Sequence, residues 1–496
     1  YYMLDSGFYM SLHFSQFIEK GWAFVDSGCY SDGKKGGDGH AIVDAVYSYM
    51  TATDTETGDY STVITNTTSG PIQYDLKVSG LDKASSNVSV WETRGPDSID
   101  GSYDENYFKK TEDITPTENG GAYTYSVTVK PNSIVTISTV TPKRTEYKNA
   151  DESERTVLKL PYSDDFEYAG YPENYLSSRG NAPRYTTDQG GAFEVEKTDK
   201  GNMLVQQITA DMKANEWGYT PEPVTTFGDD RWYNYSVNVD AAFATSQDAG
   251  SNYVGVGLRY TLGCNSYSGY WIKRDENGSW ELKANDGTLS SGSIDGFDGT
   301  ASHKLKVEAV NNVIRGYIDG NMVAEYTASD VYKRQNEGES LIGAGRASLF
   351  SSYNKNSFDN FSAEPVEGSD TYVTRFDETD SCFTFEGNWE HNLMSSFKNY
   401  KRTISDGTEG DSFTVNFEGT GFALSGETGE NAILGVSIDG GDEQLVTVSR
   451  TGQREISCHF EGLSEGAHTA KVTIKSGKYT IDAMQVTGGK IPFEKK

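Results

Sequence analysis

Two acidic segments, far apart in the chain, contain the side chains best suited to chemistry. The segment YSDDFEYAGYP (162–172) carries Asp165 and Glu167, and the segment SFDNFSAEP (357–365) carries Asp359. One segment opens a long strand-rich region and the other closes it, and the first and last strands of a jelly-roll commonly pair. Three converging carboxylates repel one another unless a cation lies among them. Since Ca²⁺ takes about six to eight oxygen ligands, we expect a calcium site here; carboxylates that cap turns in water are the alternative.

β-Strands are the elements that must position these carboxylates. Short segments of alternating polar and apolar residues, such as YSTVITNTT, IQYDLKVSG and AYTYSVTV, recur along the chain and are separated by turn residues. Favoured two-residue turns at Asn277-Gly278 and Asp319-Gly320 predict hairpins. The 53 glycines, the 32 tyrosines and a hydrophobic content of only 35% are typical of half-buried strands joined by polar loops. The sequence therefore predicts an all-β fold.

A chain of 496 residues is too long for a single core. Phe8, Met10 and Leu12 alternate with small or polar neighbours, which predicts a strand that ends a structural unit lying further upstream. We expect five segments: this strand within 1–17, an antiparallel β-sandwich at 18–142, a charged linker at 143–160, a jelly-roll with the calcium site at 161–366, and a second jelly-roll at 371–490.

The chain is strongly acidic. Its formal net charge of −30, from 73 acidic and 43 basic residues, repels phosphate backbones and argues against a nucleic-acid partner. The acidic residues are spread through loops, as on the solvated surface of a secreted protein, so we expect an extracellular location. No run of about 18 apolar residues occurs, so no membrane span is predicted. Cys382 and Cys458 fall in the same expected domain and could form a disulfide or remain two free thiols.

One family resemblance joins several of these features. The stretch SLHFSQFIEKGWAFVD (11–26), followed by a sandwich and then by DDFE and FDNF around a jelly-roll, resembles the galactosylceramidase (galactocerebrosidase) family of glycoside hydrolases. The resemblance covers about residues 1–365. It implies a (β/α)₈ barrel whose last strand lies in 1–17, then a β-sandwich, then a laminin-G-like lectin domain with bound calcium. It also implies that both catalytic glutamates of these retaining β-galactosidases lie upstream, so this chain alone is expected to be inactive.

The resemblance assigns roles to individual residues. Asp165, Glu167 and Asp359 match the calcium ligands of the family, with the carbonyl of Asn202 as a fourth. The family has Asn where this chain has Glu167, which keeps an oxygen ligand and adds charge. Trp217, in ANEWGYTPEP, matches a tryptophan that the lectin domain extends into the sugar site of the barrel. An indole ring suits the apolar face of galactose.

The last domain resembles a different group of modules. Its segments EGNWEHN, VSIDGG and IDAMQVTGG are similar to carbohydrate-binding jelly-rolls appended to microbial glycosidases. Trp389 and Tyr400, with Phe397, are then candidates for a sugar-binding platform. The same aromatic residues could instead belong to the core, since aromatic side chains beside an alternating strand are usually buried.

Two functions are consistent with the sequence. The first is the accessory, substrate-binding region of a secreted microbial β-galactosidase resembling galactosylceramidase. Its partners would be the upstream barrel and the galactose moiety of a glycan or glycolipid. The second is a non-catalytic, multi-domain carbohydrate-binding or adhesion protein.

Overall fold

The structure is a computed structural model that describes residues 4, 6–35, 42–43, 45–95, 106–147, 156–212, 222–244, 252–261, 268–284, 287–328, 342–392, 399–428, 431–448 and 456–491. Nearly all of its regular structure is β-strand, arranged in antiparallel sheets. The predicted all-β fold is confirmed. The chain divides into two compact units, Tyr1–Glu154 and Arg155–Lys496, and the boundary falls inside the charged stretch 143–160. Among the described residues, no helix has the length and apolarity that a membrane span requires.

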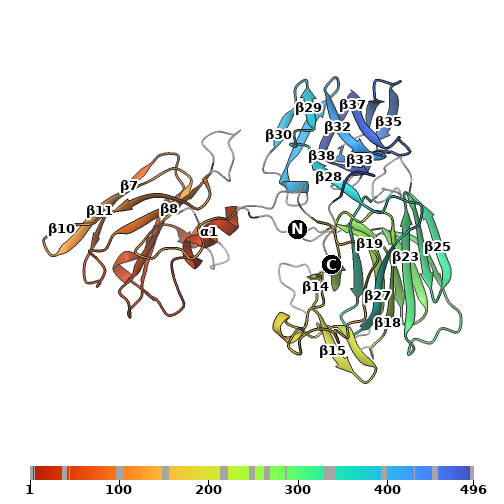
Figure 1. The fold of residues 1–496 in the computed structure, drawn as a ribbon, viewed down its shortest axis with the longest axis horizontal. Coiled ribbons are helices and arrows are strands. Elements are labelled where there is room, and N and C mark those ends of the chain that lie inside the picture. Colours follow the sequence, from red (N-terminus) through yellow and green to blue (C-terminus); the bar gives the residue numbers. More distant parts are fainter. Residues whose placement is uncertain are drawn as a thin grey trace. The chain divides into compact units, whose positions relative to one another are not determined.

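The first unit is a sandwich of one wide and one narrow sheet (Figure 1). Inward-facing Tyr60, Ile64, Val88, Val127 and Ile137 form the core between the two sheets. The wide sheet runs in the order β1 (Ala23–Phe24), β5 (Tyr47–Thr53), β6 (Tyr60–Asn66), β12 (Ser133–Ser138), β8 (Val88–Arg94), β9 (Lys109–Ile114), with β2 (Tyr30–Ser31) also paired to β5; the narrow sheet runs β10 (Thr117–Asn119), β11 (Ala122–Val129), β7 (Ile72–Val78); and β3 (Lys34–Lys35) pairs with β4 (Ile42–Val43).

The strand expected within residues 1–17 is wrong, because this segment forms helix α1 (Ser6–Ser15). Tyr9, Leu12 and His13 are buried on one face of the helix, at the spacing of three and four residues that places side chains together. The Nδ1 atom of His13 lies 2.8 Å from the hydroxyl of Thr136 on β12. Burial lowers the pKa of His13 to about 3, so the ring is neutral and the helix is held to the wide sheet by packing and neutral hydrogen bonds.

The second unit begins with a large sandwich. Hairpins join β20 (Ser268–Asp275) to β21 (Ser279–Ala284) and β24 (Val313–Ile318) to β25 (Asn321–Thr327), as predicted. The second has the predicted two-residue turn, in which Asp319 and Gly320 both have left-handed φ, 49° and 79°, whereas the first has a three-residue loop in which Gly278 has a left-handed φ of 90°. One sheet runs β15 (Phe193–Thr198), β16 (Gly201–Gln206), β27 (Ser357–Pro365), β18 (Tyr235–Ala242), β23 (His303–Val310), β24 (Val313–Ile318), β25 (Asn321–Thr327), with β13 (Tyr162–Asp164) also paired to β27; the other runs β14 (Thr186–Gly190), β17 (Val224–Phe227), β26 (Arg346–Ser351), β19 (Tyr253–Thr261), β20 (Ser268–Asp275), β21 (Ser279–Ala284), β22 (Gly287–Ser293).

A smaller sandwich follows, with its own core around Phe413, Leu424, Val472 and Ile481. Cys382 and Cys458 are not joined by a disulfide, which decides the alternative that the sequence left open. One sheet runs β30 (Glu390–Asn392), β31 (Ile404–Thr408), β38 (Lys478–Thr487), β33 (Gly421–Glu427), β36 (Ile456–Phe460), with β28 (Val373–Asp377) also paired to β38; the other runs β29 (Phe383–Glu386), β32 (Ser412–Gly419), β37 (Gly466–Ser476), β34 (Ala432–Ile438), β35 (Gln444–Val448).

The two sandwiches of the second unit are in direct contact. The backbone N–H of Ala344 donates to the side-chain oxygen of Gln485 at 3.0 Å, and the hydroxyl of Tyr233 donates to Glu461 at 3.4 Å. A Cβ added at Gly343 would meet the side-chain amide of Gln485, which shows how closely the two sandwiches approach here.

Candidate functional site

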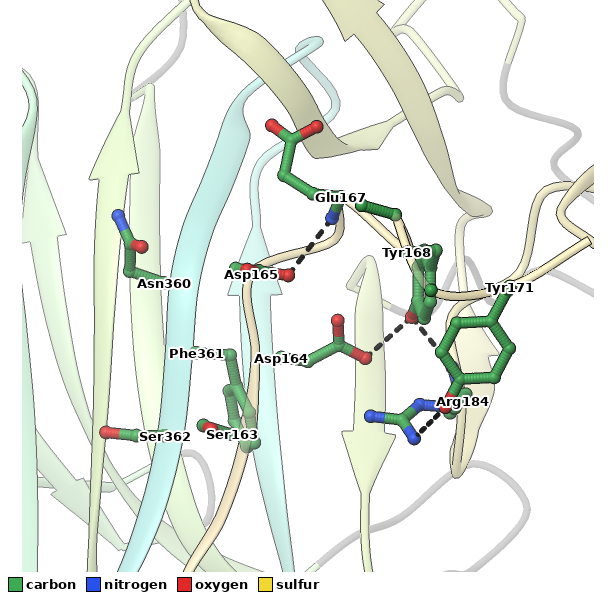
Figure 2. A pocket seen from close by; sticks show the side chains of 12 residues that line it. Ser163, Asp164, Asp165, Glu167, Tyr168, Tyr171, Arg184, Asn360, Phe361 and Ser362 are labelled. Carbon is green, nitrogen blue, oxygen red and sulfur yellow. Dashed lines mark hydrogen bonds between the residues drawn. The ribbon is translucent and has the colours of Figure 1, made fainter. Parts of the chain in front are cut away.

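The first and last strands of the large sandwich pair, as predicted. β13 and β27 are antiparallel, with Asp164 opposite Phe361. Immediately after β13 the chain reverses, and Phe166 and Tyr168 adopt left-handed φ of 57° and 50°. Side chains of this size rarely adopt that conformation. As a result, Phe166 is buried in the core while Tyr168 lies beside Tyr171 at the surface (Figure 2).

This reversal creates a surface pocket of about 510 Å³ (Figure 2). Carboxylates and serine hydroxyls lie along the paired strands, whereas tyrosine rings and a guanidinium lie on the opposite side. The pocket is lined by Ser163, Asp164, Asp165, Glu167, Tyr168, Ala169, Gly170, Tyr171, Arg184, Asn360, Phe361 and Ser362.

Asp164 organises the floor of the pocket. It is only 4% exposed and accepts three hydrogen bonds: from the backbone N–H of Phe166 at 2.9 Å, from the hydroxyl of Tyr162 at 3.0 Å and from the hydroxyl of Tyr168 at 2.6 Å. Burial, reinforced by the neighbouring Asp164 carboxylate, raises the pKa of both phenols. Both phenols therefore keep their protons and act as donors, which fixes the two rings in place.

Arg184 fills the space between the tyrosines. Its Nη1 donates to the hydroxyl of Tyr171, and its backbone N–H donates to the hydroxyl of Tyr168 at 3.1 Å. Its Nε is buried and has no hydrogen-bond partner. The guanidinium carbon lies 5.7 Å, 5.8 Å, 5.3 Å and 6.0 Å from the ring centres of Tyr162, Tyr168, Tyr171 and Tyr185, within cation–π range.

The pocket thus combines apolar ring faces with fixed hydrogen-bonding groups. Tyr171 is 39% exposed, so part of its ring is available for stacking. The guanidinium of Arg184 lines one side of the pocket, while Asp165, Glu167 and Asn360 offer oxygen acceptors on the other side. Such a site suits a molecule with an apolar face and a rim of hydroxyl groups.

The structure brings three of the predicted metal ligands together beside the pocket. The Oδ1 atom of Asp165 accepts from the N–H of Glu167 at 3.2 Å, and Oε1 of Glu167 accepts from the N–H of Asn202 at 2.9 Å. The Asn202 side chain donates to the carbonyl of Phe166 at 3.3 Å. In this arrangement the two carboxylates stabilise the turn and the β15–β16 hairpin.

Asp359, the fourth predicted ligand, lies opposite Asp240 in the pairing of β27 with β18. Burial raises the pKa of Asp359, and the negative charges of Asp240, Glu167 and Asp165 raise it further. The predicted convergence of acidic side chains therefore does produce mutual repulsion, and Asp240 is a fourth carboxylate that the sequence did not indicate.

These side chains do not form a closed set of metal ligands. Within the described part of the chain, no group of three or more Asp, Glu, His or Cys side chains is placed to hold one metal ion. One oxygen of each carboxylate accepts a backbone N–H instead: Oδ1 of Asp165 and Oε1 of Glu167 as described above, and Oδ1 of Asp359 from Asn360 at 2.7 Å. The accumulated negative charge would favour a cation, but the carboxylates are not arranged in advance as the ligands of one ion.

Two of the predicted sugar-binding aromatics, Trp389 and Tyr400, lie in the small sandwich and not in this pocket. Trp217 falls outside the described residues. Trp389 is half-buried, and its indole N–H donates to the carbonyls of Glu386 at 3.2 Å and Ser412 at 3.1 Å, so the ring is held at the edge of the core of the small sandwich. Tyr400 is also half-buried and lies beneath the guanidinium of Arg375, 5.2 Å from its ring centre.

The pocket around Arg184 was missed because its residues follow no strand or helix period. Tyr168, Tyr171 and Tyr175 lie in an irregular segment between β13 and β14, where periodicity carries no signal. The usable signal was composition, since the stretch from 162 to 185 holds five tyrosines along with Arg184.

Comparison with known proteins shows similarity in fold and assigns no family to the chain. No family model matches it, and no curated protein matches it. Its structure is distantly similar to carbohydrate-binding β-sandwich modules, lectins and transglycosylases. The carbohydrate-binding module CBM66 from Bacillus subtilis shares 13% identity over 36% of this chain and 95% of its own, with a TM-score of 0.25. The apo Crh5 transglycosylase shares 10% over 45% and 90%, with a TM-score of 0.30. The exoplasmic/lumenal domain of VIP36, in a Ca²⁺/Man3GlcNAc-bound form, shares 11% over 38% and 86%, with a TM-score of 0.27. Likeness this distant concerns the fold alone.

Proposed function

We propose that the chain is a non-catalytic carbohydrate-binding region and that it binds a saccharide in the Arg184 pocket. The observation that carries this proposal is the arrangement in one hollow of tyrosine ring faces, the guanidinium of Arg184 and carboxylate oxygens. The ring faces suit the C–H-rich face of a sugar, and the polar groups suit its hydroxyls.

A neutral saccharide fits the pocket better than an anionic one. Arg184 is opposed by Asp164, Asp165 and Glu167 in the lining, and the whole chain carries a formal charge of −30. An anionic ligand would therefore meet repulsion from both the pocket and the surrounding surface.

Replacing Arg184 tests the pocket. We expect Arg184→Lys to weaken binding of a neutral oligosaccharide, identified on a glycan array, by about tenfold or more, because lysine keeps the charge but loses the planar fork. Isothermal titration of the full chain measures the change. The matched control is Arg179→Lys: Arg179 also stacks on a tyrosine, 5.1 Å from the ring centre of Tyr175, but is not part of the pocket lining. Equal affinities for both variants and the wild type would contradict the proposal.

The galactosylceramidase resemblance supports a finer version of the proposal. In that version the bound sugar is the galactose moiety of a glycan or glycolipid, the protein is secreted, and an upstream barrel performs hydrolysis. The support comes from the motif at 11–26 and from the pairing of the segments that carry Asp165 and Asp359. The part that expected a barrel strand within 1–17 is not supported, because α1 occupies that segment.

A calcium ion bound by the acidic side chains around Asp359 is part of the same finer proposal. We expect millimolar Ca²⁺ to raise the melting temperature of the full chain relative to EDTA, because an ion that binds only the native state stabilises it, by about 2.7 kcal/mol at a hundredfold excess over Kd. Asp359→Asn should remove the shift, since it deletes one of the repelling charges.

Asp442→Asn, at an exposed position in the turn between β34 and β35, is the control and should leave the calcium shift intact. Melting curves of the wild type that coincide in EDTA and in Ca²⁺ would exclude the site.

A further inference from the structure

The first unit has an uncovered strip on the inner face of its wide sheet. The wide sheet continues past β6 to β5, which pairs with β2, whereas the narrow sheet ends at β7. A sandwich buries an inner face only where the two sheets overlap. The inner-face residues at the β2–β5 edge therefore reach the surface, and the narrow sheet forms a step beside them.

Three tyrosines occupy this strip. Tyr30 on β2 pairs directly with Tyr49 on β5, and their ring centres are 5.8 Å apart at an angle of 31°. Tyr47 lies two residues before Tyr49 and therefore on the same face of the strand. Tyr30 is 53% exposed and Tyr47 is 46% exposed. Large aromatic faces are thus presented side by side on a regular sheet rather than on a loop.

Tyr74 on β7 forms the wall of the step. Its ring meets that of Tyr49 edge to face at 6.2 Å, and its hydroxyl is buried without a hydrogen-bond partner. Burial raises the pKa of Tyr74, with smaller contributions from Tyr47, Tyr49 and Asp32, so the phenol stays neutral.

Asp32 adds an acceptor beside the rings. Its Oδ1 receives the backbone N–H groups of Val46 at 2.8 Å and Tyr47 at 2.9 Å, which fixes the carboxylate. Its Oδ2 has no hydrogen bond to any described residue, and neither do the hydroxyls of Tyr30, Tyr47 and Tyr49. Within the described part of the chain, the strip therefore has acceptors and donors without partners among its ring faces, unlike a purely apolar docking surface.

We propose that this tyrosine strip, formed by Tyr30, Tyr47, Tyr49, Tyr74 and Asp32, is a second saccharide-binding surface, distinct from the Arg184 pocket. The ring faces of Tyr30 and Tyr47 stack on sugar rings, and Asp32 with the phenol hydroxyls binds the sugar hydroxyls. The exposed row of rings on the strip suits a stretch of neutral polysaccharide chain, whereas the concave Arg184 pocket suits the end of a saccharide. Two sites on one chain would raise the apparent affinity for a polymer through avidity.

Affinity electrophoresis of the full chain tests the strip. The gels contain soluble β-1,4-galactan, arabinoxylan or mixed-linkage β-glucan, and Arg184→Lys serves as the parent so that the pocket contributes little. We expect retardation of this parent in at least one gel, and an apparent Kd at least about tenfold weaker when Tyr30→Ser and Tyr47→Ser are added. Tyr30→Phe with Tyr47→Phe keeps the rings and should retain most of the retardation, which separates stacking from misfolding.

Phe24→Ser is the matched control, because Phe24 is an exposed aromatic at the same edge but pairs with Ala52 and so lies on the opposite face. Retardation that survives the two serine substitutions, or a parent that no gel retards, would overturn the strip as a saccharide site. Self-association of the wild type that the serine variant loses, without retardation in any gel, would overturn it in favour of a protein contact. If only the pocket proposal is wrong, Arg184→Lys should bind the polysaccharide as the wild type does, and the tyrosine-to-serine variants should still bind it more weakly.

Discussion

Glu378→Gln is expected to raise the melting temperature of the small sandwich at pH 8 and to remove most of its loss of stability between pH 5 and pH 8. Glu378 is 1% exposed and lies beside Asp377 and Asp482, which are buried as well. Burial first, and then the charge of Asp377, raises the pKa of Glu378 to about 9. The folded protein therefore holds a proton on this carboxyl at neutral pH.

The hydrogen bonds around Glu378 lead to the same protonation state. The single hydroxyl of Thr403 lies 3.0 Å from both oxygens of Asp377 and 3.1 Å from Oε2 of Glu378. One hydroxyl proton cannot serve two ionised carboxylates. A protonated Glu378 can donate to the oxygen of Thr403, which then donates to Asp377. Glutamine supplies a neutral N–H donor at the same position, without the ionisable group.

The direction of the pH effect follows from the two pKa values. In the unfolded chain Glu378 titrates near its ordinary value of 4.5, and in the folded chain near 9. Between these values the folded state binds more protons, so the free energy of unfolding falls as the pH rises, by at most about 1.4 kcal/mol per pH unit. The upper limit between pH 5 and pH 8 is about 4 kcal/mol.

Calorimetry of the wild type and Glu378→Gln at pH 5, 6.5 and 8 measures this difference. The pKa of His468 is also raised, chiefly by its hydrogen bond to Asp439, so this histidine adds stability below its ordinary pKa that is lost at higher pH. Comparing the two proteins cancels that contribution. Glu390→Gln, at an exposed position on β30, should behave as the wild type. Parallel pH profiles for all three proteins would show that Glu378 is ionised in the folded state.

Local sequence rules were sufficient for the strands and their turns. The Asp319-Gly320 pair predicted a hairpin because only small or Asx residues adopt left-handed φ easily at both positions, and both do so here. The pairing of the segments around Asp164 and Phe361 was also predictable, since it depends on topology and not on detailed packing.

The helix α1 was missed for a physical reason. The alternation of Phe8, Met10 and Leu12 matched a strand, but Tyr9, Leu12 and His13 are the residues that become buried. Histidine does not count as apolar in a hydropathy pattern, and the hydrogen bonds of its two ring nitrogens to the hydroxyls of Thr136 and Thr93 make the burial of His13 possible. Tertiary contact thus overrode the local pattern.

The pocket could be predicted only in part. Its acidic side comes from the segments that the sequence singled out, which carry Asp165 and Glu167. Its aromatic side depends on the left-handed backbone at Phe166 and Tyr168, which no local rule predicts for aromatic residues. Arg184 reaches the same space from the other end of the irregular segment, just before β14.

Asp164→Ala is expected to cost about 3–5 kcal/mol of stability in the large sandwich and to abolish saccharide binding in the Arg184 pocket. Each hydrogen bond to a buried charged group contributes about 1.5–3 kcal/mol, and Asp164 accepts three of them, although contributions within one network are not additive. Without Asp164, the phenol of Tyr162 is left buried and unpaired, and Tyr168 loses the bond that orients its ring. Arg184 then loses the fixed aromatic wall against which it stacks.

Asp164→Asn separates the shape of the network from its charge. The Asn oxygen can still accept from the N–H of Phe166, and its amide group can donate to the oxygens of Tyr162 and Tyr168, which then act as acceptors. We expect this variant to recover more than half of the stability that alanine loses and to bind within about threefold of the wild type. Chemical denaturation gives the stability, and titration with the oligosaccharide chosen on the glycan array gives the affinity.

Ser163→Ala, at the adjacent exposed position in the same pocket lining, should change stability little. If Asp164→Asn is as damaging as Asp164→Ala, the negative charge is what the two tyrosines require. If Asp164→Ala binds the sugar as the wild type does, the network does not shape the binding site.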